Sequence, residues 1–296
     1  MDRNAIRTVC ICNGTHGDEL SGIELASYWR AYPSSITRPT FKTRLLEVNP
    51  RAVVEHKRYI DRDIQDCFSY AALNGDEISD DYELERARQI AKEIGTNFPK
   101  DPGQDLIIDL HDTTCSMGVT LNTSCGCPFC TSAIAYLYSL YPSVIKILYS
   151  PQDKITSPYL ESLGKCGITV ECGPQQRNQI NADLTLQEGK IVSKLLDYVE
   201  TWNRGLRMPK RPVPVYRWLG ELHYRSKDEQ VYSGLIGKDY QPVMKGYVLM
   251  TEKDKPSYIW KKDHTVWPCF IDEKSYKNAE EAEVSMVLTD LCIQLW

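Results

Sequence analysis

The chain has 296 residues, of which 42% are hydrophobic and 25% are charged, as is usual for a soluble globular protein. Its 35 basic and 40 acidic residues give a net charge of −5, which does not favour nucleic acid or an anionic membrane as a partner. No basic segment leading into an apolar stretch begins the sequence, and the later apolar stretch at residues 132–149 is too polar to span a bilayer. We therefore expect a cytoplasmic protein.

Short apolar runs and helical segments alternate along the first two-thirds of the sequence. The apolar runs predict strands at residues 7–12, 45–48, 105–110, 144–149 and 168–172. Composition and 3.6-residue spacing predict helices at residues 19–32, 81–93 and 184–202. This alternation favours a three-layer α/β/α fold, with helices on both faces of one sheet.

The pattern changes after about residue 205. Pro209, Pro212 and Pro214 predict a linker at residues 208–214. Short β-like runs follow at residues 231–236, 247–251, 258–261 and 266–271. We therefore predict a catalytic domain at residues 1–207 and a smaller, β-rich C-terminal domain at residues 208–296 that covers the active-site cleft.

The chain has 11 cysteines, and without a secretion signal we expect reduced thiols rather than a disulfide framework. Cys125, Cys127 and Cys130, with Cys115 nearby, form the one local group. This group could hold a structural zinc ion or form a redox-sensitive loop. Structural zinc usually takes four ligands from two CxxC or Cys/His pairs. Because only one such pair is visible here, we favour a plain reduced loop.

His16 and Glu19 lie three positions apart on a glycine-flanked turn after the first apolar run, and His111 ends another apolar run. Such residues could also be a helix-capping turn and an unrelated strand end. However, two imidazoles and one carboxylate with an open position for water are the usual protein ligands of catalytic zinc. Since sites in open α/β sheets form at the carboxyl ends of strands, we predict one catalytic zinc ion per chain at these residues.

Five motifs occur in a fixed order, at residues 14–19, 49–52, 58–61, 109–111 and 171–175. Together they resemble the aspartoacylase and aminoacylase-3 family of zinc carboxypeptidase-like amidohydrolases. The resemblance is dense as far as Gln175 and sparse after about Gly205. It implies a deacylase that acts on a small N-acyl substrate, with acetyl as the expected acyl group, and it implies a homodimer.

Glu171 is the best candidate for the general base, because it lies near a strand end that can face the zinc ligands. It would take a proton from the zinc-bound water and return it to the departing amine. The alternative is a carboxylate that caps the turn at residues 173–174. The resemblance implies that Arg58 stabilises the oxyanion and that Tyr276 reaches the substrate from the second domain.

The departures from the family pattern concern substrate recognition. Gln65 and Asp66 stand where the family has an Asn-Arg pair that grips the carboxylate of the amino-acid product. Asp112 replaces an asparagine, and Glu161 stands where aspartoacylases have an arginine for the second carboxylate. The candidate substrate-binding residues are therefore Gln65, Asp66, Asp112, Tyr159, Glu161 and Tyr276.

Three hypotheses follow for the activity. In the one that we favour, Asp66, Asp112 and Glu161 form an acidic pocket for a cationic or non-carboxylate N-acyl substrate. Alternatively, Asp66 pairs with Arg58 or Arg62, the carboxylate is bound elsewhere, and the protein is a conventional deacylase of N-acyl aspartate or aromatic amino acids. The third hypothesis is a zinc- or ligand-binding protein without turnover, which the retained catalytic residues argue against.

Overall fold

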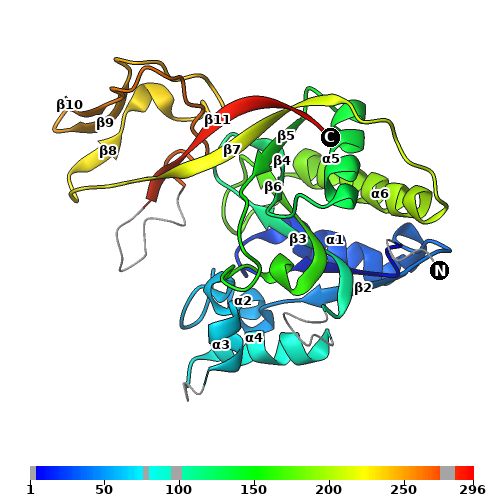
Figure 1. Ribbon diagram of the computed structural model, residues 1–296. Helices are drawn as coiled ribbons and strands as arrows, with labels where there is room; N and C mark the ends of the chain where they lie inside the picture. The colour runs from blue at the N-terminus through cyan, green and yellow to red at the C-terminus, as the bar shows by residue number, and fades with distance from the viewer. Residues whose placement is uncertain (1–4, 76–79, 95–101, 274–283) are drawn as a thin grey trace.

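The computed structural model describes residues 5–75, 80–94, 102–273 and 284–296 (Figure 1). Its centre is an eight-stranded sheet with the order β11-β7-β5-β4-β6-β3-β1-β2. The strands are β1 (Thr8–Asn13), β2 (Lys42–Glu47), β3 (Gln104–Asp112), β4 (Gly118–Thr123), β5 (Ile145–Tyr149), β6 (Gly164–Gly173), β7 (Pro212–His223) and β11 (Val284–Leu295). Strands β2, β1, β3 and β6 are parallel neighbours, whereas β4 runs antiparallel to β6.

Helices cover both faces of this sheet, which confirms the predicted three-layer fold (Figure 1). They are α1 (Leu20–Ala31), α2 (Pro50–Glu55), α3 (Tyr70–Asn74), α4 (Tyr82–Glu93), α5 (Pro128–Leu140) and α6 (Ala182–Asn203). Apolar side chains of α1, α5 and α6 pack on one face in the largest buried cluster. On the other face, α4 and the 3-10 turns Ile64–Cys67 and Leu160–Leu163 pack over a second buried cluster.

The C-terminal part of the chain contributes to two sheets. Strands β7 and β11 extend the central sheet, and β8 (Glu229–Val231), β9 (Val248–Glu252) and β10 (Lys255–Ile259) form a separate three-stranded sheet. This smaller β-rich unit confirms the predicted fold class. Of the other β-like runs, residues 233–235 form a 3-10 turn, and residues 266–271 contribute only isolated bridges.

The linker prediction at residues 208–214 was wrong at its end, because β7 already begins at Pro212. Pro212 and Pro214 pair with β11 on one side, while the pairing of β7 with β5 starts only at Tyr216. Proline cannot donate a backbone hydrogen bond, but it is tolerated where a strand has no neighbour on that side. Strand β4 and helix α5 were not predicted at all.

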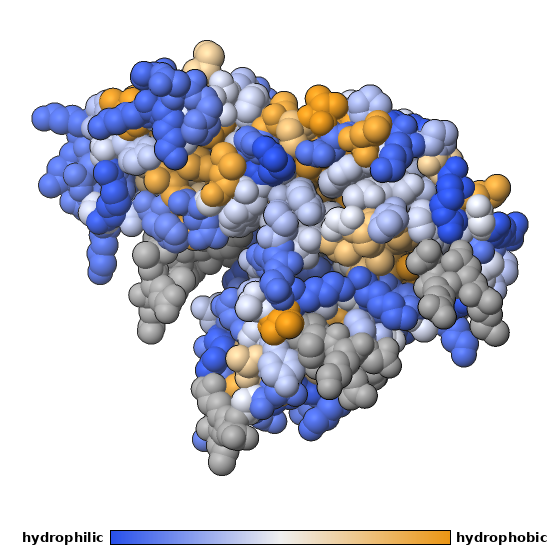
Figure 2. Space-filling model, in the orientation of Figure 1, coloured by the Kyte–Doolittle hydropathy of each residue, from blue (hydrophilic) through white to orange (hydrophobic). Residues whose placement is uncertain are grey.

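Among the described residues, no helix combines the length and the hydrophobicity needed to cross a membrane. The face of the molecule in Figure 2 is largely hydrophilic, and its hydrophobic residues form separate groups.

Candidate metal and catalytic site

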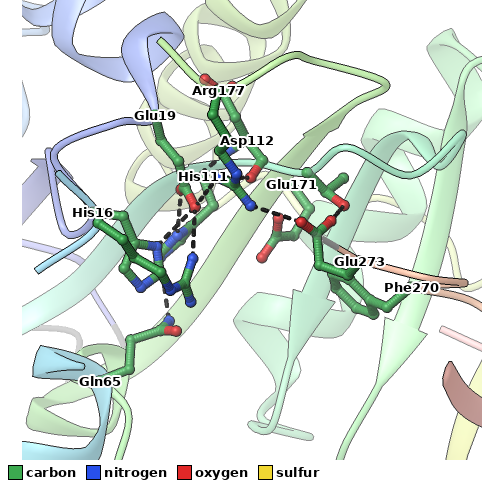
Figure 3. A pocket seen from close by; sticks show the side chains of 11 residues that line it. His16, Glu19, Gln65, His111, Asp112, Glu171, Arg177, Phe270 and Glu273 are labelled. Atoms are coloured by element: carbon green, nitrogen blue, oxygen red, sulfur yellow. Dashed lines mark hydrogen bonds and ion pairs between the residues drawn. The ribbon is translucent and has the colours of Figure 1, made fainter. Parts of the chain in front are cut away.

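A pocket opens where β1, β3 and β6 end at the same edge of the sheet. Parallel pairing places His111 of β3 directly beside Glu171 of β6, and β1 on the other side of β3 leads into the turn that carries His16. The C-terminal segment contributes Phe270 and Glu273 to the wall. The lining residues are His16, Glu19, Arg58, Gln65, His111, Asp112, Thr113, Glu171, Arg177, Phe270 and Glu273 (Figure 3).

The turn after β1 can place His16 and Glu19 here only with glycine at position 17. A Cβ atom on Gly17 would lie 2.1 Å from the backbone of Ala52 in α2, which excludes any other residue without a shift of the chain. The Gly17 amide also donates to the carbonyl oxygen of Arg58. The turn is therefore packed against α2 and against the segment that supplies Arg58.

His16, Glu19 and His111 face one another in the pocket (Figure 3). The Nδ1 atoms of both histidines lie against the same carboxylate, 2.8 Å and 2.9 Å from its two oxygens. All three side chains are between 2% and 4% exposed, and they form one of the groups of His, Cys, Asp and Glu that could hold a metal ion. The donor set therefore fits a metal with three protein ligands and an open position.

The outer nitrogens of both imidazoles are held by other carboxylates. His16 Nε2 lies 3.1 Å from Asp63, and His111 Nε2 lies 3.0 Å from Asp109. Such contacts fix the ring orientation and leave Nδ1 for a metal. Burial lowers the pKa of His111, but Asp109 and Glu19 outweigh burial and raise it well above its ordinary value. The site thus attracts positive charge strongly.

Glu171 keeps partial exposure to the pocket, in contrast to the buried metal-ligand candidates. Burial raises the pKa of Glu171 to about 7, with Glu19 and Glu273 adding to the rise and His111 opposing it. A carboxylate with a pKa near neutrality can both accept and return a proton. The position and the pKa of Glu171 therefore suit a general base.

Arg58 belongs to a loop that the buried Glu83 of α4 stabilises through hydrogen bonds. The Glu83 carboxylate accepts hydrogen bonds from the backbone amides of Ile60, Asp61 and Arg62. The Arg58 guanidinium donates to Asp63 at 2.8 Å and to Glu19 at 3.3 Å. This loop thus brings a cation beside the metal-ligand candidates.

Arg177, on the loop after β6, is a pocket residue that the sequence analysis missed. Its guanidinium bridges Glu19 and Glu273, with a distance of 2.9 Å to Glu273, and it donates to the carbonyl oxygen of Asp112 at 3.0 Å (Figure 3). The only signal in the sequence was a basic residue two positions after the motif that ends at Gln175. Glu273 was missed as well, although it lies three positions before Tyr276, the residue that the family resemblance named in this segment.

The candidate substrate-binding residues do not all meet. Gln65 and Asp112 line the pocket, whereas Asp66 is exposed on a 3-10 turn and is not among the lining residues. Tyr159 and the buried Glu161 also lie outside the lining, at the turn before β6. Tyr276 falls outside the described residues.

Asp112 directs its carboxylate away from the metal-ligand candidates. It accepts a hydrogen bond from the backbone amide of Ser21 at 3.0 Å. The Ser21 hydroxyl lies within hydrogen-bond distance of both the Asp112 carboxylate and the carboxylate of the buried Glu188. Burial raises the pKa of Asp112 to about 6. The Asp112 carboxylate is therefore already engaged by Ser21.

Comparison with known proteins gives consistent matches over nearly the whole chain. The family model described as the succinylglutamate desuccinylase/aspartoacylase catalytic domain matches residues 5–199, and the AstE/AspA barrel-sandwich hybrid domain matches residues 211–285. A probable aspartoacylase of a Nostoc strain is 33% identical, with 97% of each chain covered. An N-acyl-aromatic-L-amino acid amidohydrolase (carboxylate-forming) of Xenopus laevis is 31% identical, covering 96% of this chain and 94% of that one. The crystal structure of murine aminoacylase 3 superposes with a TM-score of 0.90 at 27% identity, covering 99% of this chain and 98% of that one.

Proposed function

Because the chain belongs to the succinylglutamate desuccinylase/aspartoacylase family, we propose that it hydrolyses the amide bond of a small N-acyl amino acid. The observation that carries this proposal is the meeting of two functions in one pocket. The buried triad of His16, Glu19 and His111 suits a metal ion, and the partly exposed Glu171 beside it suits a base. A binding protein without turnover would have no use for Glu171 there.

His16, Glu19 and His111 would hold one zinc ion. When bound, zinc would polarise the substrate carbonyl and make a water molecule more acidic. The chain itself keeps the imidazoles in place through Asp63 and Asp109. These two carboxylates act as positioning residues.

Glu171 and Arg58 divide the remaining chemistry between them. Glu171 accepts a proton from the attacking water and delivers it to the nitrogen of the departing amine. Arg58 is held by Asp63 yet retains partial exposure, so it can donate to the oxygen that becomes negative when water adds to the amide. Glu171 thus acts on the water and the amide nitrogen, and Arg58 acts on the carbonyl oxygen.

We propose further that Arg177 takes over the binding of the substrate carboxylate. The acidic-pocket hypothesis now depends on Asp112 alone, because Asp66 and Glu161 do not line the pocket. Arg177 instead presents a guanidinium at the wall, and a guanidinium can bind a carboxylate through two parallel hydrogen bonds. A cationic substrate is the competing hypothesis, since Glu273 lies in the same wall.

A panel of N-acetylated aspartate, phenylalanine, lysine and uncharged amines, assayed for release of the free amine, tests both proposals. We expect turnover that depends on zinc and is best for the aspartate or phenylalanine derivative, which carries a free α-carboxylate and no cationic side chain. Preference for the lysine derivative or for an uncharged amine would favour the competing hypothesis. No release from any compound by the zinc-loaded protein would contradict the proposed activity.

A further inference from the structure

Four cysteine side chains meet beside the start of α5, away from the pocket. We call them the cysteine cluster: Cys125, Cys127, Cys130 and Cys166. Their sulfur atoms all lie within 4.8 Å of one another, and all four thiols are free. The sulfur atoms of Cys127 and Cys166 lie 3.1 Å apart.

The fourth member of this cluster comes from a distant part of the chain. Cys125 and Cys127 lie in the connection from β4 to α5 and Cys130 in the first turn of α5, whereas Cys166 lies on β6. Cys115, the neighbour in sequence, lies elsewhere, with its thiol donating to the carbonyl oxygen of Ile271 at 3.3 Å. The missing fourth ligand was the reason for favouring a plain loop, and that reason no longer holds.

The size of the cluster fits a single tetrahedral ion. Zinc–sulfur bonds of about 2.3 Å place the sulfur atoms of a four-thiolate site about 3.8 Å apart. Thiols that already lie within 4.8 Å of one another can reach this arrangement by small side-chain rotations. Four thiolates also leave no open position, which is typical of a structural site.

The N-terminus of α5 and the Lys154 ammonium bring positive charge near the cluster. Cys127 is the N-cap of α5, and its sulfur accepts a hydrogen bond from the backbone amide of Cys130 at 3.4 Å. The positive end of the helix dipole therefore points at these sulfurs. In addition, the Lys154 ammonium binds the carbonyl oxygen of Lys165 at 2.7 Å, next to Cys166 in the chain.

We propose that the cysteine cluster binds one structural zinc ion, which ties the β4–α5 connection to strand β6. This site does not rest on the proposed activity. Cys166 belongs to the apolar cluster under α5 and α6, whereas Glu171 lines the pocket on the other face of β6. Five residues of strand also separate them by roughly 16 Å. The ion would therefore act by holding the strand that carries Glu171, not by touching substrate.

The test counts metal in the full chain, purified under reducing conditions without chelator and then loaded with zinc. Wild-type protein should hold about two zinc ions per chain, and His111→Ala should keep about one. After cobalt replaces zinc in His111→Ala, we expect the near-ultraviolet absorption of cobalt bound to thiolates. That absorption should disappear when Cys127→Ser and Cys166→Ser are added. Cys292→Ser, which removes a half-buried thiol outside the cluster, is the matched control and should keep it.

Several results would overturn the proposal. The first is the absence of bound metal in His111→Ala after zinc loading. The second is the absence of the thiolate absorption from its cobalt form, and the third is the loss of that absorption on Cys292→Ser. Purification with iron in the cluster would also contradict zinc. Should the double cysteine variant fail to fold, the cobalt spectrum of His111→Ala still decides, because that variant leaves all four cysteines in place.

Discussion

Strand β6 separates two groups of ionisable side chains. One group leaves a ligand position open, and the other does not. On the pocket face, Glu171 stands beside a triad with one carboxylate and two imidazoles, and two arginines approach the same carboxylate. On the opposite face, Cys166 joins three thiols at the start of α5. The first group mixes charges and keeps one base partly exposed, and the second is a closed set of like ligands.

One strand can therefore carry a catalytic residue on one face and a stabilising ligand on the other. An open ligand set leaves room for substrate but needs neighbouring charges such as Asp63 and Asp109 to hold it. A closed thiolate set holds itself together through the ion and needs no further groups. Variants on the two faces should therefore change different properties.

Replacement of His111 by Ala should have the largest effect, because it removes one of three metal ligands. Amide hydrolysis should fall to the background rate, while the fold survives. The double replacement Cys127→Ser with Cys166→Ser should instead lower the melting temperature and leave much of the rate per folded molecule. The exposed His264→Ala serves as the control for His111. If His111→Ala and the double cysteine variant lost the same rate per folded molecule, the distinction between the two faces would be wrong.

Glu171→Gln should lower kcat by about 10²- to 10⁴-fold with zinc content unchanged, since it removes only the base. The pH profile gives a second measurement. The carboxylate must be deprotonated to accept a proton, and its pKa is raised to about 7, so kcat/KM of the wild type should rise with pH toward that value. A bound cation would move this rise to lower pH. A Glu171→Gln variant with the wild-type rate would place the base elsewhere.

Glu161→Gln tests the effect of a buried carboxyl group in the 3-10 turn that precedes β6. Burial raises the pKa of Glu161 to about 7, above its ordinary 4.5. The folded chain therefore binds this proton more tightly than the unfolded chain, and stability falls as pH rises from about 4.5 to 7. Glutamine removes that loss and should raise the unfolding free energy by about 2–3 kcal/mol at pH 8 but little at pH 4. Urea unfolding at both pH values measures this, and an equal difference at the two would contradict it.

Arg177→Gln should have the smallest effect, and it sharpens the substrate proposal. We expect kcat/KM to fall about 10- to 100-fold for N-acetyl amino acids, with a much smaller change for the matching carboxamides that lack the α-carboxylate. Arg177→Lys should recover part of the loss. Because Arg177 also contacts Glu19, zinc content must be measured in both variants. Equal losses for acids and carboxamides would assign Arg177 a positioning role only.

The parts of the fold that were predicted are those with a strong local pattern. Strands β1, β3 and β6 are almost entirely buried, so each appears in the sequence as a continuous apolar run. Strand β4 has only two large apolar residues, Val119 and Leu121, and β7 begins with prolines that suggest a linker, so neither was predicted. Proline at the first position of α5 was a helix-start signal that could have been used.

The site residues also divide into those that belong to a local sequence motif and those that do not. His16, Glu19, His111, Arg58 and Glu171 belong to ordered motifs and were named from the sequence alone. Arg177 and Glu273, however, are 96 residues apart and meet only because the C-terminal segment folds back over the pocket. Cys166 lies 39 residues beyond Cys127 on a strand, where a thiol looks like any small apolar residue.

The central claim is that water cleaves an amide in the pocket formed by β1, β3 and β6. Hydrolysis of an N-acetyl amino acid in water enriched in oxygen-18 tests it most directly, with the products examined by mass spectrometry. The account predicts one oxygen-18 atom in the released acetate, none added to the free amino acid, and formation of labelled acetate at least about 10²-fold slower with Glu171→Gln. Unlabelled acetate, or labelled acetate formed equally well by Glu171→Gln, would contradict it.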